Sequence, residues 1–320
     1  MHALRLALTL LAVCLLLGAS ASASEAVPVA VGVYRPEYPD NLSSLDEYER
    51  GAGRPIQLVH WYALWGGWKA AFNPAELESV RQRGSTPMIT WEPWSGTRND
   101  AAWNLRSAIL SGASDVYIHQ WARGMAAYGG PVLLRFAQEM HDQTYPWAVG
   151  INGNTPSDYV AAWRYVHAIF DEERASNVQW VWNPNTMPGA PREHYQGIYR
   201  ALYPGDDAVD WFGLDIYNGG VDLPSWGGSR SFADALGAPY EALQDVAPKP
   251  IVLAEVGSAE DGGKKATWID TAFTDLEMGR FPAVRALVWF DVDKEERWGL
   301  HSSDATLASW TAALRSTSLQ

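Results

Sequence analysis

The fold of this chain is decided by short apolar segments, and the most informative is PVLLRFAQE at residues 131–139. A proline opens the segment, apolar residues follow, and a glutamate, Glu139, ends it. The segment PIVLAEVGS at residues 250–258 has a similar form and carries Glu255. A buried charge is unfavourable without a partner, so an ionisable group at the end of a buried strand indicates a functional site.

The same kind of segment recurs throughout the chain. Eight of them are nearly continuous in Val, Ile, Leu and Trp instead of alternating with polar residues, which is typical of strands covered on both faces. They occupy residues 27–35, 55–62, 86–94, 131–139, 177–185, 209–218, 250–258 and 284–293.

Helix signals lie between these segments. Asn73 followed by Pro74 predicts the start of a helix over residues 73–83. Thr155 followed by Pro156 predicts another over residues 155–174, with aromatic and aliphatic residues repeating on one face. Further helices are expected near residues 43–50 and over 115–128, 229–246, 264–278 and 304–315, and the pair Lys264 and Lys265 is expected to face solvent.

Eight strand–helix units in a chain of 320 residues predict an α/β fold, a (β/α)8 TIM barrel in a single domain. A doubly wound open sheet is the alternative. It would be expected to carry a Gly-rich phosphate turn after the first strand, where this chain has GVYRPEYPD at residues 32–40.

Residues 1–23 have the form of a secretory signal peptide, with a basic start, an apolar stretch and small residues before the cleavage site. The apolar stretch is too short to span a bilayer comfortably, so no membrane anchor is expected after cleavage. Residues 24–320 would then form the mature domain, which we expect to be secreted, either extracellular or periplasmic. The only cysteine, Cys14, would leave with the signal, so no disulfide is expected.

Composition restricts the partners. The formal net charge of −13 argues against binding to nucleic acid. The 17 Trp and 14 Tyr outnumber the 8 Phe, which fits either an aromatic core or a cleft whose flat rings stack on sugars. The histidines show no spacing typical of a metal site, so neither a metal nor another cofactor is expected.

Functional groups of a TIM barrel gather where its strands end. Glu139 and Glu255 end the fourth and seventh strands, whose tips face each other across the mouth of a barrel. Two carboxyl groups at one pocket are the equipment for cleaving a glycosidic bond, either with retention through a glycosyl-enzyme or with inversion through a direct attack by water. Arg135 and Tyr217 would lower the pKa of an attacking carboxylate by charge and hydrogen bonding.

The chain also resembles glycoside hydrolase family 26, whose barrel enzymes are mainly β-mannanases, with some lichenases and β-1,3-xylanases. The resemblance lies in RFAQEMHDQTYPWAVG, YVAAWRYVHAIF, NVQWVWNPN, YPGDDAVDWFGLDIYN, KPIVLAEVGSAEDGGKKATWI and VWFDVDKEERW. It implies that Glu139 is the acid/base and Glu255 the nucleophile. It also implies that Tyr217 hydrogen-bonds the nucleophile, that Trp289 floors the subsite of the attacked sugar, and that Trp147 bounds the cleft.

Two departures from the family pattern lie beside the expected scissile bond. Gln138 stands where the family usually has His, and His141-Asp142 replaces Asn-Gly. An amide donates and accepts hydrogen bonds but carries no charge. Glu92 precedes a proline and is expected to be structural. The residues expected to contact substrate are Gln138, Tyr217, Trp289, Trp147, Arg135, Trp61, Trp91, Trp94, Asn183 and His141.

The sequence therefore predicts a secreted, monomeric, cofactor-free, retaining endo-β-glycosidase that acts on a polysaccharide. β-1,4-Mannan is the first candidate substrate. Mixed-linkage glucan, β-1,3-glucan, β-1,3-xylan or an exopolysaccharide are the alternatives. A glycan-binding protein without catalytic activity is the competing class, and a phosphate-handling barrel enzyme, with GSAEDGGKK at residues 257–265 as its loop, is a third.

Overall fold

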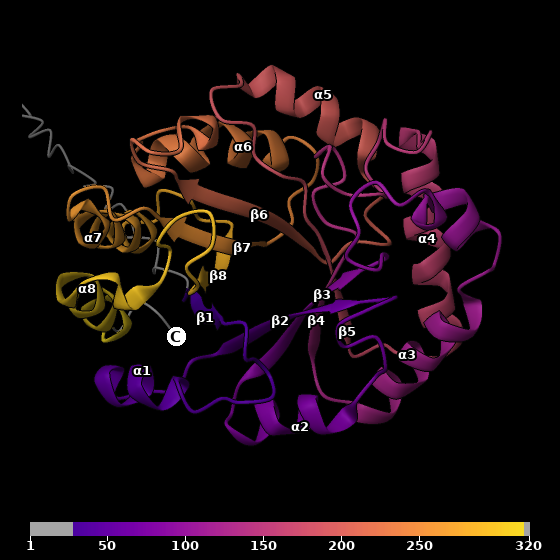
Figure 1. The fold of residues 1–320 in the computed structure, drawn as a ribbon, viewed down its shortest axis with the longest axis horizontal. Helices are drawn as coiled ribbons and strands as arrows, with labels where there is room; N and C mark the ends of the chain where they lie inside the picture. Colours follow the sequence, from indigo (N-terminus) through magenta and orange to yellow (C-terminus); the bar gives the residue numbers. More distant parts are fainter. Residues whose placement is uncertain (1–27, 317–320) are drawn as a thin grey trace, which may run out of the picture.

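Eight parallel strands close into a barrel in the computed structural model, which describes residues 28–316 (Figure 1). Each strand pairs with the next one in the chain, and the last strand returns to pair with the first. The strands are β1 (Ala30–Tyr34), β2 (Leu58–Leu64), β3 (Thr86–Glu92), β4 (Val132–Phe136), β5 (Val178–Trp182), β6 (Trp211–Asn218), β7 (Ile251–Ser258) and β8 (Val284–Phe290). The TIM barrel is confirmed, whereas the expected signal peptide lies outside the described residues.

Helices surround the barrel and fill the connections between strands (Figure 1). Asn73 accepts a hydrogen bond from the Ala75 amide, and Thr155 forms a capping box with Asp158, so both expected helix starts are present. The helices are α1 (Leu45–Ala52), α2 (Pro74–Gln82), α3 (Asp115–Tyr128), α4 (Pro156–Glu172), α5 (Arg192–Leu202), α6 (Phe232–Gln244), α7 (Lys264–Glu277) and α8 (Asp304–Leu314).

Helix α5 is the helix that the sequence signals did not indicate. It follows Pro191 without a side-chain cap, and Gly197 lies within it, which lowers its intrinsic helix propensity. The helix is stabilised by burial of one face, because Tyr195, Tyr199 and Leu202 pack into the core.

The strands separate two apolar layers. Side chains such as Leu58, Met88 and Val252 fill the interior of the barrel, while a larger cluster lies between the strands and the helices. Successive residues of a strand point to opposite faces, so position along a strand decides which layer a side chain joins.

A β-bulge in β7 interrupts this alternation beside the expected site. Between Leu253 and Val256 the strand has one more residue than either neighbouring strand. Ala254 belongs to the interior cluster and Val256 to the outer one, so regular alternation would have sent Glu255 outward. The extra residue instead lets Glu255 face the mouth of the barrel.

The expectation that Lys264 and Lys265 both face solvent is wrong for the second lysine. The Lys264 side chain is 67% exposed, whereas that of Lys265 is 0% exposed. The Lys265 ammonium donates to the Arg297 carbonyl, to the Gly299 carbonyl at 3.0 Å and to the Ser302 hydroxyl at 2.7 Å. It therefore joins the start of α7 to the loop after β8.

We predict that Lys265→Met lowers the free energy of unfolding by about 3 kcal/mol, because it removes a buried ammonium and leaves the Arg297 and Gly299 carbonyls without this donor. Lys264→Met makes the same change at the neighbouring exposed position and should alter stability by less than about 0.5 kcal/mol. Denaturant unfolding of both variants measures the difference. Equal effects would show that Lys265 does not hold the loop.

Candidate active site

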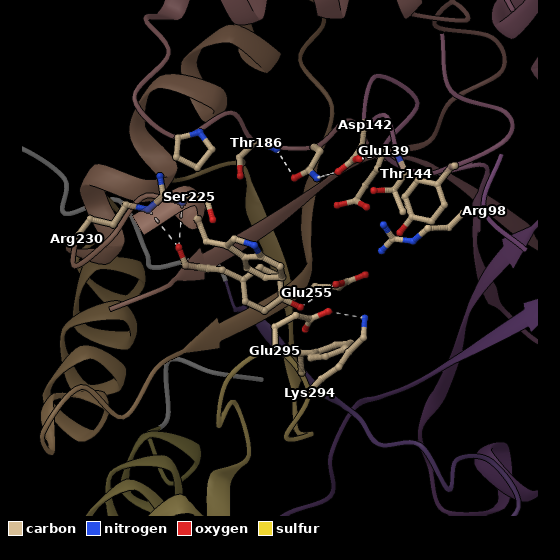
Figure 2. Close-up of a pocket in the computed structure, with 16 residues that line it drawn as sticks. Arg98, Glu139, Asp142, Thr144, Thr186, Ser225, Arg230, Glu255, Lys294 and Glu295 are labelled. Carbon is tan, nitrogen blue, oxygen red and sulfur yellow. Dashed lines mark hydrogen bonds and ion pairs between the residues drawn. The ribbon is translucent and has the colours of Figure 1, made fainter. Parts of the chain in front are cut away.

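A cavity of about 470 Å³ opens at the C-terminal ends of the strands. It is lined by Glu139 and Glu255, by the aromatic rings of Tyr145, Tyr217, Trp226 and Phe290, and by polar groups of the surrounding loops. Figure 2 shows Glu139 and Glu255 projecting into this one space from different elements. The two carboxyl groups that the sequence singled out are thus brought together.

Three donors surround the Glu255 carboxylate. Its Oε1 accepts hydrogen bonds from the Tyr62 hydroxyl at 2.5 Å and from Arg135 Nη1 at 2.7 Å. Its Oε2 accepts one from the Tyr217 hydroxyl at 2.8 Å. Burial acts to raise the pKa of Glu255, but the guanidinium charge and the two hydroxyls outweigh it and bring that pKa to about 2. Glu255 is therefore ionised at neutral pH.

Space for one of these donors depends on a glycine. A Cβ atom added to Gly257 would lie 2.8 Å from the Tyr217 ring, closer than ordinary packing allows. The bare backbone at this position lets the ring lie against β7, from where its hydroxyl reaches Glu255.

Arg135 is fully buried and holds two carboxylates at once. Its Nη1 binds Glu255, and its Nη2 binds Asp215 Oδ2 at 2.5 Å. Asp215 also accepts a hydrogen bond from the Asn183 amide at 2.8 Å. Burial of a guanidinium is tolerated when its charge is matched in this way.

Glu139 has the opposite environment. It follows β4, and both Ala137 and Glu139 have positive φ, at 43° and 52°, which few non-glycine residues adopt. The Glu139 amide donates to the Asn183 carbonyl at 2.7 Å, which fixes this turn. Burial, followed by the negative charges of Asp215 and Glu255, raises the pKa of Glu139 well above its usual range. This environment favours the protonated form of Glu139.

Two further carboxyl groups lie beside this pair. Burial raises the pKa of Asp215 to about 7 despite the nearby Arg135. Glu92 ends β3, accepts a hydrogen bond from the Gln138 amide at 2.6 Å and another from the Trp94 indole at 3.1 Å, and has its pKa raised to about 7 by burial. Glu92, expected to be structural, thus belongs to the buried polar network of the site.

Three of the tryptophans expected to contact substrate do not reach the cavity. Trp61, Trp91 and Trp289 are fully buried in the layer between strands and helices. The Trp289 indole donates to the Trp298 carbonyl at 3.0 Å, and its ring packs against Trp268 and Trp310. These three tryptophans point outward because side chains alternate along a strand. The residue after each of them, Tyr62, Glu92 or Phe290, faces the interior instead.

Three other expected contacts lie one layer behind the cavity surface. Trp147 is fully buried, stacks on Tyr145 with ring centroids 4.5 Å apart, and donates to the Gln138 carbonyl at 2.8 Å. Trp94 packs on the edge of both rings. His141 packs near Tyr199, and burial lowers its pKa to about 4. Tyr145 therefore forms the cavity wall that Trp147 was expected to form.

Sequence reasoning missed Tyr62, Tyr145 and Trp226. Tyr62 lies two residues after His60 on β2, so the period of two would have placed both toward the interior. Tyr145 lies in a loop and Trp226 in a three-residue 3-10 helix, Pro224–Trp226, and neither is long enough for periodicity to indicate direction.

Within residues 28–316, no group of three or more His, Cys, Asp or Glu side chains is arranged to hold a metal ion. In the same part of the chain, no helix combines the length and apolar character needed to cross a bilayer.

A closed eight-stranded barrel with one carboxyl group just after β4 and another on β7, both lining one cavity, has the architecture of a barrel glycoside hydrolase. Residues 90–229 match the sequence profile of glycosyl hydrolase family 26. The chain is also 36% identical over 275 residues to Endoglucanase H of Acetivibrio thermocellus, a match that covers 85% of this chain and 29% of that protein. The chain belongs to glycosyl hydrolase family 26.

Two further similarities were found, one in sequence and one in fold. The chain is 31% identical over 111 residues to Beta-1,3-xylanase TXYA of a Vibrio species, which covers 34% of this chain and 22% of that protein. The chain thus matches less than a third of the length of either curated relative. The structure of a family 26 β-mannanase from Bacteroides ovatus superposes with a TM-score of 0.68 at 17% identity, covering 92% of this chain and 90% of that one.

We predict that Tyr62→Phe moves the acid limb of the kcat/KM profile to higher pH by about one unit. The hydroxyl stabilises the ionised form of Glu255, so its loss raises the pKa of that carboxyl group. Tyr165→Phe is the matched control, because its hydroxyl binds Asp115 on the outer helices. An acid limb that stays in place in Tyr62→Phe, with the fold intact at the same pH, would contradict this role.

Proposed function

We propose that this protein is a retaining endo-β-glycosidase that hydrolyses a polysaccharide, with Glu255 as nucleophile and Glu139 as acid/base. The observation that carries the proposal is the difference between two carboxyl groups in one cavity: three donors surround Glu255 and lower its pKa, whereas burial and neighbouring negative charges raise the pKa of Glu139. Retaining hydrolysis requires this pairing.

In the first step, Glu255 attacks the anomeric carbon while Glu139 donates its proton to the departing glycosidic oxygen. The C–O bond to the leaving group breaks, and an ester bond to Glu255 forms. Arg135, Tyr62 and Tyr217 keep the carboxylate oriented and ionised for the attack.

In the second step, Glu139 removes a proton from water, which attacks the same carbon and releases Glu255. The change of role follows from the electrostatics of the site. The negative charge of Glu255 is one cause of the raised pKa of Glu139, and that charge disappears while Glu255 is esterified. The pKa of Glu139 therefore falls when a base is needed.

We propose a β-glucan as the first substrate to test and β-1,4-mannan as the second. Endoglucanase H is 36% identical to this chain over 275 residues, and its name supports a glucan backbone. Gln138, where a histidine is usual, lies in the site beside Glu139 and is hydrogen-bonded to Glu92. Mannan is the second candidate because some of the structural neighbours are mannanases.

The further expectations from the sequence also stand as proposals. We propose that the protein is secreted through its N-terminal signal, acts as a monomer without a metal or other cofactor, and has the polysaccharide as its partner. A non-catalytic glycan-binding protein remains the competing class, and the same assay distinguishes the two.

The test is reducing-end release from mixed-linkage β-glucan, β-1,3-glucan, β-1,3-xylan and β-1,4-mannan, with proton NMR of the first product formed. We predict cleavage of a β-glucan within the chain and a β-configured product. Glu255→Gln should lower the rate by about 10⁴-fold or more. Binding without cleavage, with Glu255→Gln indistinguishable from the unmodified protein, would support the binding class, and an α-configured first product would exclude Glu255 as nucleophile.

A further inference from the structure

Arg230 is a partly buried cation at the edge of the cavity that has no ion-pair partner. Its Nε and Nη2 both donate to the backbone carbonyl of Tyr217, at 3.2 and 3.0 Å. No carboxylate of residues 28–316 forms an ion pair with it, and burial lowers its pKa. Figure 2 shows the guanidinium group beside Ser225 at one end of the cavity.

The comparison with Arg135 shows why this is unusual. The guanidinium group of Arg135, which is fully buried, has carboxylates on two of its nitrogens. Arg230 hydrogen-bonds only a neutral carbonyl, and the charge of Asp234, which forms no ion pair with it, offsets its burial only in part. Partial burial of a charge without a paired counter-charge is unfavourable, so a ligand that supplies an opposite charge at the cavity would be favoured there.

The neighbours of Arg230 form the rest of a subsite. The half-buried Trp226 ring stacks on Trp298, with centroids 5.5 Å apart, and lines the cavity beside Arg230. Ser225 and Thr186 supply hydroxyl groups at the same end. A flat aromatic ring, hydroxyl groups and a guanidinium fork are the groups that would hold a sugar carrying a carboxylate.

We propose that this end of the cavity binds an acidic sugar, and that the substrate is a β-glycan in which some residues carry a carboxylate that pairs with Arg230. The inference rests on the proposed glycosidase function and specifies its substrate class. A carboxylate matches the planar geometry of guanidinium, so a uronic acid or a carboxylated substituent is the expected ligand.

The net charge of the whole protein opposes the binding of an acidic chain anywhere that lacks a local positive group. At a net charge of −13 the surface repels an anionic polymer over long distances. Salt at about 0.15 M screens exposed charges beyond about 8 Å but acts less on a partly buried pair. The preference for an acidic over a neutral chain should therefore increase when ionic strength rises from about 0.01 M to about 0.15 M.

The test is calorimetric binding of two oligosaccharides that differ only in oxidation of a primary alcohol to a carboxylate. Oligosaccharides of mixed-linkage β-glucan and their C6-oxidised forms serve as the probes. Binding is measured with the Glu255→Gln variant, which should not hydrolyse the oligosaccharides, so the result does not depend on cleavage. We expect the oxidised form to bind about 10-fold more tightly at about 0.15 M salt, which corresponds to about 1.4 kcal/mol.

Adding Arg230→Met should reduce this ratio to about one, while Arg230→Lys should keep part of it because the charge remains. Arg200→Met is the matched control, since it removes the same charge from the exposed face of α5 and should preserve the ratio of the two affinities.

If Arg230→Met does not fold, the test rests on the ratio of affinities for the oxidised and unoxidised oligosaccharides in the protein that keeps Arg230. An affinity ratio near one in that protein overturns the inference. The inference is also overturned if Arg230→Met lowers the affinity for both oligosaccharides equally, because Arg230 would then act only by positioning Tyr217. Cleavage of neutral glycans with a ratio near one would leave the proposed function intact.

Discussion

The site depends on one buried guanidinium group. Arg135 lies inside the barrel near the end of β4 and binds Glu255 and Asp215 simultaneously. Two carboxylates so close together would repel each other without this cation between them. Its charge is what allows Glu255 to remain ionised in a place where burial alone would favour the protonated form.

The same arrangement leaves Glu139 without such support. No residue described in the chain forms an ion pair with Glu139, and the negative charges of Asp215 and Glu255 add to its burial. The pKa values of two glutamates in one cavity therefore move in opposite directions, because burial acts to raise both but Arg135 forms an ion pair with Glu255 alone. Division of acid and nucleophile roles follows from this difference in environment and needs no difference in residue type.

Much of this was predictable from the sequence. The eight apolar segments predicted the barrel, and the carboxylates near the ends of 131–139 and 250–258 predicted where the cavity lies. The direction of each side chain was harder to predict. Trp289 and Phe290 are neighbours on one strand, and only the register of the closed sheet decides that Phe290 faces the cavity. The bulge at Ala254, the positive φ of Glu139 and the buried Lys265 depend on tertiary contacts that no local pattern encodes.

The central claim is that Glu255 is the group that attacks the sugar. It is tested most directly by trapping with a 2-deoxy-2-fluoro-β-glycosyl fluoride of the preferred sugar, followed by proteolysis and mass spectrometry of the labelled peptide. The account predicts one sugar per chain, attached to Glu255 and released slowly. A label on Glu139 or Glu92, or rapid hydrolysis of natural substrate by a protein that is never labelled, would contradict it.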